Sequence, residues 1–336
     1  MNNKEGKVII LINNNRVCGI LGITYPIVQA AMNWITDANM VAAVSNAGGM
    51  GVLGPNAGPK MVGSKRINTE ERIRNELRKI KSLTDKSFAV NIILPEEGMD
   101  DNGFYVRTTL NVALEEGVKH FVTVGKVNRQ VFNEIKDQGG ILIHRELNPT
   151  TEAAKRAEEA GADIIIATGY DEGGVIPQRS IGTFSIVPTI VDAVDIPVIA
   201  TGGINDIRGV RAAFALGAEG VYVGTRFIVS DECPASDVTK QQIIYSKGTD
   251  LLSVSSTQRS IPNKAAQEYE GLYKNGMPSD QVDKKISENG GLRTGMLEGK
   301  MDEGIVSVNT AIDLITEVKT CEDIVKELMA DFKNEC

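Results

Sequence analysis

Apolar residues gather in short runs along the chain, and these runs alternate with longer amphipathic segments. The runs are rich in Val, Ile and Ala and are bounded by Gly and polar residues, which is typical of parallel strands buried on both faces. The predicted strands are Pro26–Ala30, Gly48–Gly54, Phe88–Leu94, His120–Val124, Ile141–Leu147, Ala162–Thr168, Pro197–Ala200 and Gly220–Val223. Because a helical segment follows each strand, the sequence predicts an α/β protein with a closed (β/α)8 TIM barrel.

The pattern changes after residue 232. We expect residues 1–15 to form an N-terminal extension or a peripheral strand, and residues 16–232 to form the barrel. Residues 233–300 are interpreted as a mostly helical insertion that covers the barrel mouth as a lid. Residues 301–336 are expected to pack on the barrel as helices, with one over Thr310–Val318 and another over Cys321–Asn334.

Two neighbouring strand ends carry glycines suited to an anion. Pro197–Ala200 leads into Gly202-Gly203, and Gly220–Val223 leads into Gly224-Thr225. Glycine permits tight turns and lets backbone N–H groups approach a ligand, and Thr225 adds a hydroxyl. These glycines alone would serve for tight turns. Two such βα loops side by side, however, form the phosphate site of many TIM barrels after the last two strands.

Composition and charge exclude several classes of function. A net charge of −8 and a pI near 5.1 argue against a nucleic-acid partner, which requires a basic face. The four cysteines are scattered and no His cluster accompanies them, so neither a metal site nor a disulfide framework is expected. The run Val8–Ile12 is too short to span a membrane. We therefore expect a cytoplasmic protein; its oligomeric state is left open, a homodimer included.

The strand ends taken together resemble the nitronate monooxygenase family, formerly called 2-nitropropane dioxygenases. This family includes the bacterial type II enoyl-acyl-carrier-protein reductases. The resemblance runs from about Arg16 to the C-terminus. It depends on PIVQAAM (26–32), SNAGGMGVLG (45–54), VNI around Asn91, the 169–174 loop, IPVIATGGI (196–204) and LGAEGVYVGTRF (216–227).

The resemblance implies FMN in the barrel mouth and assigns roles by position. The backbone at Ala31 and Met32 would lie along the isoalloxazine ring. Asn91 would bind the flavin, although as a polar residue in an apolar strand it would equally suit a structural hydrogen bond. Three further contacts are implied: Thr168 in place of a cofactor-contacting Gln or Glu, Gly173 near the ribityl chain, and Gly203, Gly224 and Thr225 at the phosphate.

One departure from the family pattern concerns catalysis. The family carries a histidine directly after the Gly-Gly of the 169–174 loop, and here that position is Val175, which has no titratable group. The chain has two histidines, His120 at the start of a strand and His144 in mid-strand beside Arg145 and Glu146. The better-placed candidates are in the loop, where Tyr170 and Asp171 are predicted as catalytic residues. Glu172, in the same loop, is a further candidate.

Three functions follow as hypotheses. The first is an FMN-dependent oxidoreductase acting on a small organic substrate, either like a nitronate monooxygenase or as an enoyl thioester reductase. The reductase would use NADH or NADPH and an acyl-carrier protein or CoA thioester, with Lys60, Lys65 and Arg66 as a basic rim. The second is a flavin-binding protein without catalysis. The third is a phosphate-binding barrel enzyme without flavin, which lacks a catalytic Cys in a suitable loop.

Overall fold

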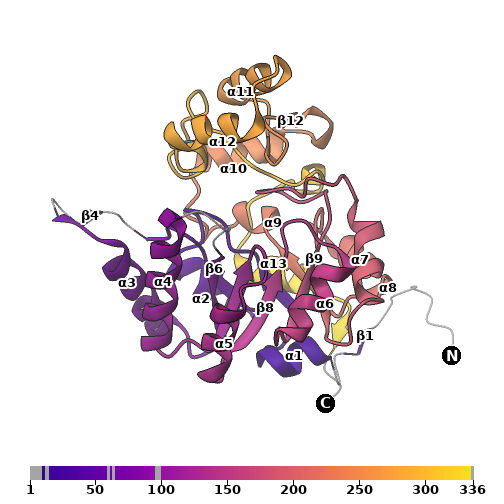
Figure 1. Cartoon of the computed structure of the whole chain (residues 1–336). Helices are drawn as coiled ribbons and strands as arrows, with labels where there is room; N and C mark the ends of the chain where they lie inside the picture. Colours follow the sequence, from indigo (N-terminus) through magenta and orange to yellow (C-terminus); the bar gives the residue numbers. More distant parts are fainter. Residues whose placement is uncertain (1–9, 12–14, 59–60, 63–64, 95–99, 334–336) are drawn as a thin grey trace.

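The protein, described from a computed structural model covering residues 10–11, 15–58, 61–62, 65–94 and 100–333, is built around a parallel barrel. The barrel strands are β2 (Ile27–Gln29), β3 (Gly51–Leu53), β6 (Phe88–Ile93), β7 (His120–Val124), β8 (Ile141–Arg145), β9 (Ile164–Thr168), β10 (Val198–Thr201) and β11 (Gly220–Val223). They pair in the order β2-β11-β10-β9-β8-β7-β6-β3. A parallel bridge between Val28 and Met50 closes the ring. The predicted TIM barrel is confirmed (Figure 1).

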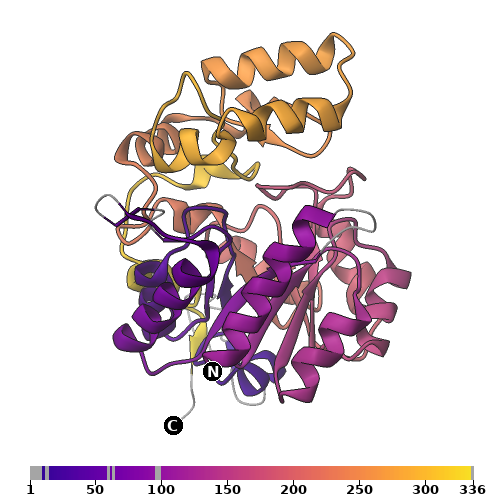
Figure 2. The same ribbon diagram turned by 60° about the vertical axis from the view of Figure 1, so that its left-hand side comes forward.

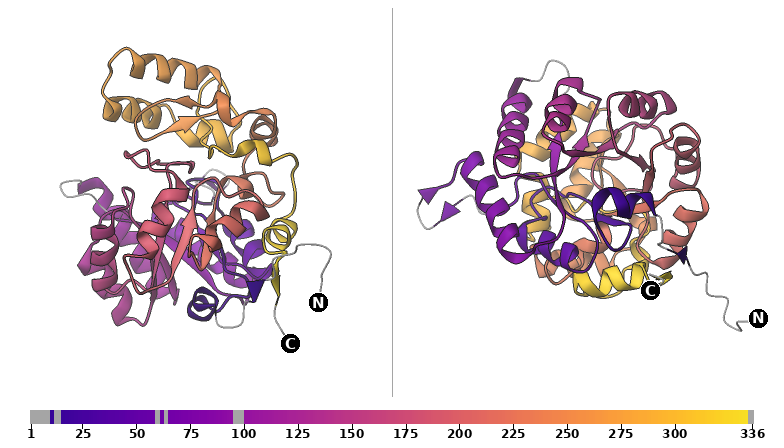
Figure 3. Two further views of the ribbon diagram at one scale, coloured as in Figure 1. Left: turned by 90° about the vertical axis from the view of Figure 1, so that its right-hand side faces the viewer. Right: turned by 90° about the horizontal axis from the view of Figure 1, so that it is seen from below.

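Helices surround the barrel on its outside. They are α2 (Ala38–Asn46), α3 (Thr69–Leu83), α4 (Asp100–Glu115), α5 (Arg129–Asp137), α6 (Thr151–Glu159), α7 (Thr183–Val191) and α8 (Ile207–Ala215). Several begin at a side chain that accepts hydrogen bonds from first-turn N–H groups, such as Asp37 at α2 and Asp206 at α8. A short helix, α1 (Arg16–Leu21), lies across the lower opening of the barrel (Figure 3).

Two apolar layers result from the alternation of side chains along the strands. The inner layer fills the barrel below its mouth and includes Val28, Met50, Val52, Ala89, Val122, Ile143, Ile164, Ile166, Ile199 and Tyr222, with Val17 and Leu21 of α1 beneath. The outer layer lies between strands and helices. Inward side chains at the upper strand ends are therefore the ones free to form a site.

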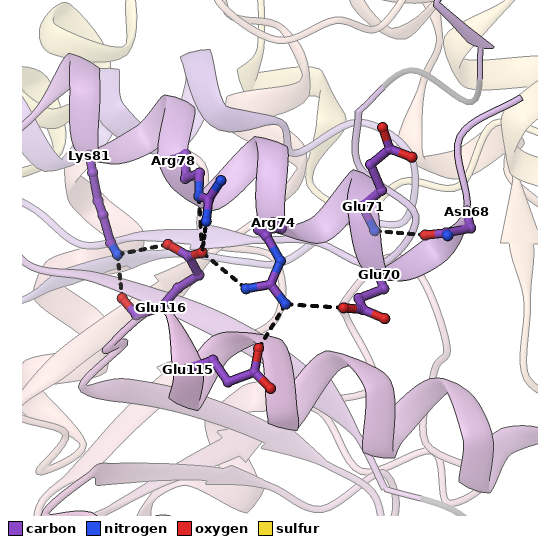
Figure 4. A network of polar contacts seen from close by, with 8 residues as sticks. All are labelled: Asn68, Glu70, Glu71, Arg74, Arg78, Lys81, Glu115 and Glu116. Carbon is purple, nitrogen blue, oxygen red and sulfur yellow. Dashed lines mark hydrogen bonds and ion pairs between the residues drawn. The ribbon is translucent and has the colours of Figure 1, made fainter. Parts of the chain in front are cut away.

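A network of ion pairs joins α3 to α4 on the outside of the barrel (Figure 4). Arg74 contacts Glu70 at 3.1 Å, Glu115 at 2.7 Å and Glu116 at 3.2 Å. Glu116 also forms ion pairs with Arg78 at 3.0 Å and with Lys81 at 3.3 Å. Exposed pairs contribute little singly, about 0–1 kcal/mol each, so the effect of this network is to hold two adjacent helices in register.

The segment after residue 232 lies over the upper ends of the strands (Figures 1 and 2). It contains α10 (Asp237–Tyr245), the hairpin of β12 (Leu252–Ser253) and β13 (Arg259–Ser260), α11 (Lys264–Lys274), α12 (Ser279–Glu288) and a π-helical turn at Arg293–Leu297. It has a small apolar core of its own, which includes Val254, Ala266, Val282 and Ile286. The helical insertion expected for residues 233–300 thus faces the barrel mouth.

The expected helix over Thr310–Val318 is wrong, because only a 3-10 turn at Ile312–Leu314 forms there. The backbone before it bonds to the barrel instead: Thr310 N–H donates to Asp171 O at 3.0 Å, and Ala311 O accepts from Asn205 Nδ2 at 2.9 Å. The last helix, α13 (Cys321–Leu328), ends earlier than expected.

The two ends of the described chain meet below the barrel. Strand β14 (Phe332–Lys333) pairs in parallel with β1 (Ile10–Leu11). Within the expected N-terminal extension, Ile10 and Leu11 thus form a peripheral strand, and residues 1–9 and 12–14 lie outside the described residues. Between β3 and α3, β4 (Met61–Val62) and β5 (Lys65–Arg66) form a short antiparallel pair. None of the helices in the described ranges has both the length and the apolar character needed to cross a membrane.

Candidate functional site

A cavity of about 290 Å³ opens at the carboxyl ends of the barrel strands. Its walls come from the ends of the strands, from the 172–175 loop, and from the segment above the mouth through Gln258, Leu292 and Met296. Of the residues predicted from the sequence, the structure brings together Ala31, Met32, Asn91, Gly173, Gly203, Gly224 and Thr225. Active sites of TIM barrels lie at this face.

One end of the cavity is lined by bare backbone. Gly203 adopts φ +69°, which favours glycine, and it follows Gly202 at +115°. Among the described residues, none accepts a hydrogen bond from the backbone N–H of Gly203 or Gly224. Gly224 precedes the short helix α9 (Thr225–Ile228), whose first residue brings its hydroxyl to the same end. Unpaired N–H groups and a hydroxyl are donors that suit a phosphate.

The adjoining wall is the loop after β2, which hydrogen bonds hold in one conformation. The N–H of Ala31 donates to the Tyr222 hydroxyl at 2.9 Å. The hydroxyl of Thr36 contacts both the N–H and the carbonyl of Met32, at 3.0 Å and 2.7 Å. Burial raises the pKa of Tyr222 to about 12, so its hydroxyl stays neutral at ordinary pH. The backbone at Ala31-Met32 therefore presents a fixed surface to the cavity.

Asn91 makes a structural hydrogen bond and also borders the cavity. It lies in mid-β6, is buried, and its Nδ2 donates to the carbonyl of Val122 on β7 at 3.1 Å. It also lines the cavity. The hydrogen bond to the adjacent strand orients the amide, which leaves its oxygen as an acceptor for a ligand.

Three predicted residues do not line the cavity. Thr168 is buried at the end of β9, where its Oγ1 accepts from Arg145 Nε at 3.3 Å. The Asp171 carboxylate accepts from the N–H of Thr183 at the start of α7, at 2.6 Å. The Tyr170 ring packs under the guanidinium of Arg259, 4.8 Å from its centroid. The side chains of Tyr170 and Asp171, predicted as catalytic, are thus occupied by contacts outside the cavity.

Two charged residues line the cavity instead: Glu172, the third candidate of the loop, and Arg145, for which no role was predicted from the sequence. Arg145 ends β8, and Glu172 follows Asp171 in the loop after β9; the Arg145 Nη2 forms an ion pair with Glu172 Oε1. Burial raises the pKa of Glu172 to about 7, against the opposing effects of Arg145 and Arg259. The sequence held a signal for Arg145, since a charged residue that ends an apolar strand points into the mouth.

The position after Gly173-Gly174 is apolar, as the sequence shows. Val175 lines the cavity and is 45% exposed. His144 does not replace the absent imidazole, because it points outward from β8 onto Phe132 of α5, with ring centroids 5.2 Å apart. His120 lies at the lower end of β7. Neither histidine reaches the cavity.

The chain near residue 308 seals one side of the cavity. Gly174 N–H donates to Ser307 Oγ at 2.8 Å, and Asn309 N–H donates to Thr225 Oγ1 at 3.0 Å. Asn309 and Asn205 exchange two side-chain hydrogen bonds of 2.8 Å and 2.9 Å. In the described ranges, no group of three or more His, Cys, Asp or Glu side chains is placed to hold a metal ion.

Comparison with known proteins finds matches along most of the chain. A family model described as nitronate monooxygenase matches residues 14–331. A probable nitronate monooxygenase of Staphylococcus aureus strain JH9 is 33% identical over 303 residues, covering 77% of this chain and 82% of the relative. One of Staphylococcus haemolyticus strain JCSC1435 is 33% identical over 277 residues, covering 71% and 74%.

Two solved structures share the fold. FabK from Thermotoga maritima superposes with a TM-score of 0.81 at 30% identity, covering 94% of this chain and 95% of that one. Nitroalkane oxidase from Streptomyces ansochromogenes superposes with a TM-score of 0.77 at 24% identity, covering 94% and 97%.

Proposed function

Because this chain belongs to the nitronate monooxygenase family, whose members depend on flavin, we propose that it is an FMN-dependent oxidoreductase that oxidises a small anionic nitronate. The observation that carries the proposal is the cavity itself. It has a glycine-lined end with free backbone donors, an apolar middle, and a wall made by a fixed loop. This is the arrangement that an elongated cofactor with a phosphate at one end requires.

The residues present fit FMN. Its phosphate would be held by the N–H groups of Gly203 and Gly224 and by the hydroxyl of Thr225, which need no lysine or arginine to bind an anion. A side chain at Gly203 would approach the Cβ of Asp171 to 3.3 Å, so the close backbone surface depends on glycine there. The ring would lie along Ala31-Met32 with its polar edge toward Asn91.

Bound FMN would supply the electron transfer, while the chain positions the substrate and excludes water. Leu292 and Met296 reach the cavity from the segment above the mouth, and Ile93 and Val124 form apolar surface below. This enclosure favours a small substrate over a large one.

Val175 bears on which form of the substrate is used. A neutral nitroalkane must lose a proton from carbon before oxidation, and that step calls for a base within hydrogen-bond reach. Valine provides none at this position, and the one carboxylate of the cavity, Glu172, is engaged in the ion pair with Arg145, whereas a nitronate is already ionised. The apolar residue therefore supports oxidation of the pre-formed anion.

The second candidate is an NAD(P)H-dependent enoyl thioester reductase. It is favoured by the likeness to FabK, at 30% identity over nearly the whole of both chains. An acyl-carrier protein or CoA thioester would then be the partner. Of the proposed basic rim, Lys60 and the side chains of Lys65 and Arg66 lie outside the described part of the chain.

One set of spectra and assays separates these functions. The purified protein is incubated with FMN, its visible spectrum is recorded, and it is mixed without oxygen with ethyl nitronate, NADH or NADPH. Bleaching by the nitronate, with nitrite released in air, supports the proposal. Bleaching by NAD(P)H with reoxidation by an enoyl thioester supports the reductase. Bound flavin that no reagent reduces indicates a flavin-binding protein without catalysis, and absence of flavin binding overturns both enzymes.

A further inference from the structure

The ion pair between Arg145 and Glu172 is an unusual feature for an apolar cavity. Both side chains are nearly buried, with exposed fractions of 11% and 9%. No other Asp, Glu, Lys, Arg or His side chain of the described chain lines the cavity. A buried ion pair costs desolvation energy and is poor evidence for a purely stabilising role, so its place in the cavity calls for another explanation.

The guanidinium of Arg145 has N–H donors that no described residue uses. Its Nε donates to Thr168 Oγ1 at 3.3 Å, and its Nη2 contacts Glu172 and donates to the carbonyl of Val175 at 3.2 Å. No residue in the described ranges accepts from Nη1. Among described side chains, the buried atoms without a partner are His144 Nε2 and Arg259 Nη1, so Nη1 of Arg145 is not sealed from the cavity. One face of this guanidinium is open to a ligand.

Positive charge exceeds negative charge around Glu172. Arg145 on β8 pairs with its carboxylate, and the positive charge of Arg259 on β13 also favours the ionised form of Glu172. The Nη2 of Arg259 donates to the carbonyl of Tyr170 at 2.8 Å. The remaining titratable neighbour is Tyr222 of β11, which stays neutral because burial raises its pKa to about 12. The positive charges of two guanidinium groups therefore act on one carboxylate, and burial nonetheless raises the pKa of that carboxyl to about 7.

We propose that Arg145 and Glu172 form a proton-coupled anion subsite: a small monoanionic group of the substrate binds the open face of Arg145, and Glu172 takes up one proton as it does so. An anion beside an ionised Glu172 would place two like charges in a cavity of low dielectric constant, and protonation removes that repulsion. The subsite rests on the proposed function, because it assigns the anion to the substrate of the same cavity.

Calorimetry with propionate tests the subsite on the FMN-loaded protein. Propionate stays ionised from pH 6 to 9, and propionamide is a neutral control of the same shape. Above pH 7 the dissociation constant of propionate should rise about ten-fold per pH unit. Titrations in buffers of different ionisation enthalpy should show the uptake of about one proton per propionate. Propionamide binding should not change with pH.

Three variants assign the effect to these side chains. Glu172→Gln should bind propionate with no pH dependence and, at two pH units above 7, about 100-fold more tightly than the parent. Arg145→Gln should lose propionate binding. Glu146→Gln is the matched control. It removes the carboxylate that directly follows Arg145 in the sequence, and because Glu146 does not line the cavity, propionate binding should be unchanged.

Several results would overturn the subsite: pH-independent binding by the parent, no proton uptake, or propionate binding that survives Arg145→Gln. If Arg145→Gln weakens FMN binding alone, the guanidinium serves the cofactor and the inference fails. Should Glu172→Gln not fold, the proton count of the parent decides. The flavin spectrum distinguishes failure of the two proposals. A protein that binds no flavin contradicts the proposed flavoenzyme, whereas a flavin-loaded protein without proton-coupled propionate binding contradicts only the subsite.

Discussion

The Oγ1 of Thr225 accepts a hydrogen bond of 3.0 Å from the N–H of Asn309, a residue that follows it by 84 positions. Thr225 stands at the end of the last barrel strand, and Asn309 belongs to the chain that returns from the segment above the mouth. The single hydroxyl therefore joins the proposed phosphate end of the cavity to the stretch that closes it. Its hydrogen remains available to a ligand.

Replacement of Thr225 should affect both cofactor and stability. Thr225→Val removes the hydroxyl at nearly constant volume, leaves the buried Asn309 N–H unpaired, and should cost about 1–2 kcal/mol of unfolding free energy. FMN should bind at least about ten-fold more weakly, measured by quenching of flavin fluorescence. Thr225→Ser keeps the hydroxyl and is expected to behave like the parent. Equal FMN affinity in the Val and Ser variants would contradict the role of this hydroxyl.

Adjacent glycines in the 172–175 loop should respond differently to alanine. At Gly173 an added Cβ would lie 2.7 Å from the carbonyl carbon of Val308, so Gly173→Ala should displace the 307–309 stretch. Gly174 has open space but φ +81°, so Gly174→Ala should cost only about 1–2 kcal/mol of backbone strain. Hydrogen exchange of the Asn309 amide separates the two. It should accelerate in Gly173→Ala far more than in Gly174→Ala, and the reverse order would refute the packing described.

The buried carboxyl of Glu172 should make stability depend on pH. Its pKa rises from 4.5 to about 7 on folding, chiefly through burial, so the native state holds the proton more tightly than the unfolded state. The resulting contribution is fully present below about pH 4.5 and is lost as pH rises to about 7. Relative to Glu172→Gln, the parent should therefore lose on the order of 3 kcal/mol between these pH values. Urea unfolding of both proteins measures this; a constant difference across the range would be inconsistent with a raised pKa.

Val175→His tests what the loop position can do. Val175 lines the cavity, so an imidazole placed there should reach a ligand and act as a base. We expect the variant to gain oxidation of neutral nitroethane that the parent lacks, with a rate that rises with pH near the ordinary histidine pKa of about 6.5. Val175→Asn, polar but without a base, should show no such gain. Nitrite release at constant FMN occupancy measures both, and failure of the His variant would mean that the cavity around it has diverged.

The sequence determined the barrel because its strands carry local information. Runs such as Ala162–Thr168 can be stable only when both faces are covered, and the glycines after β10 and β11 mark where the backbone must turn. Strand ends of a parallel barrel meet at one face, which brings Gly203 and Thr225 together, and the resemblance to the family assigns Ala31 and Asn91 to the same site. The sequence also showed that the position after Gly173-Gly174 is the apolar Val175.

Only the tertiary structure decided which loop side chains enter the cavity. Tyr170, Asp171 and Glu172 are consecutive and similar in polarity, yet contacts with Arg259 and with the start of α7 hold the first two outside, and Arg145 draws in the third. The stretch at Thr310–Val318 likewise has helical composition, but hydrogen bonds to Asp171 and Asn205 take its backbone groups. These partners are distant in the chain, and local pattern does not encode contacts that form only when the barrel closes.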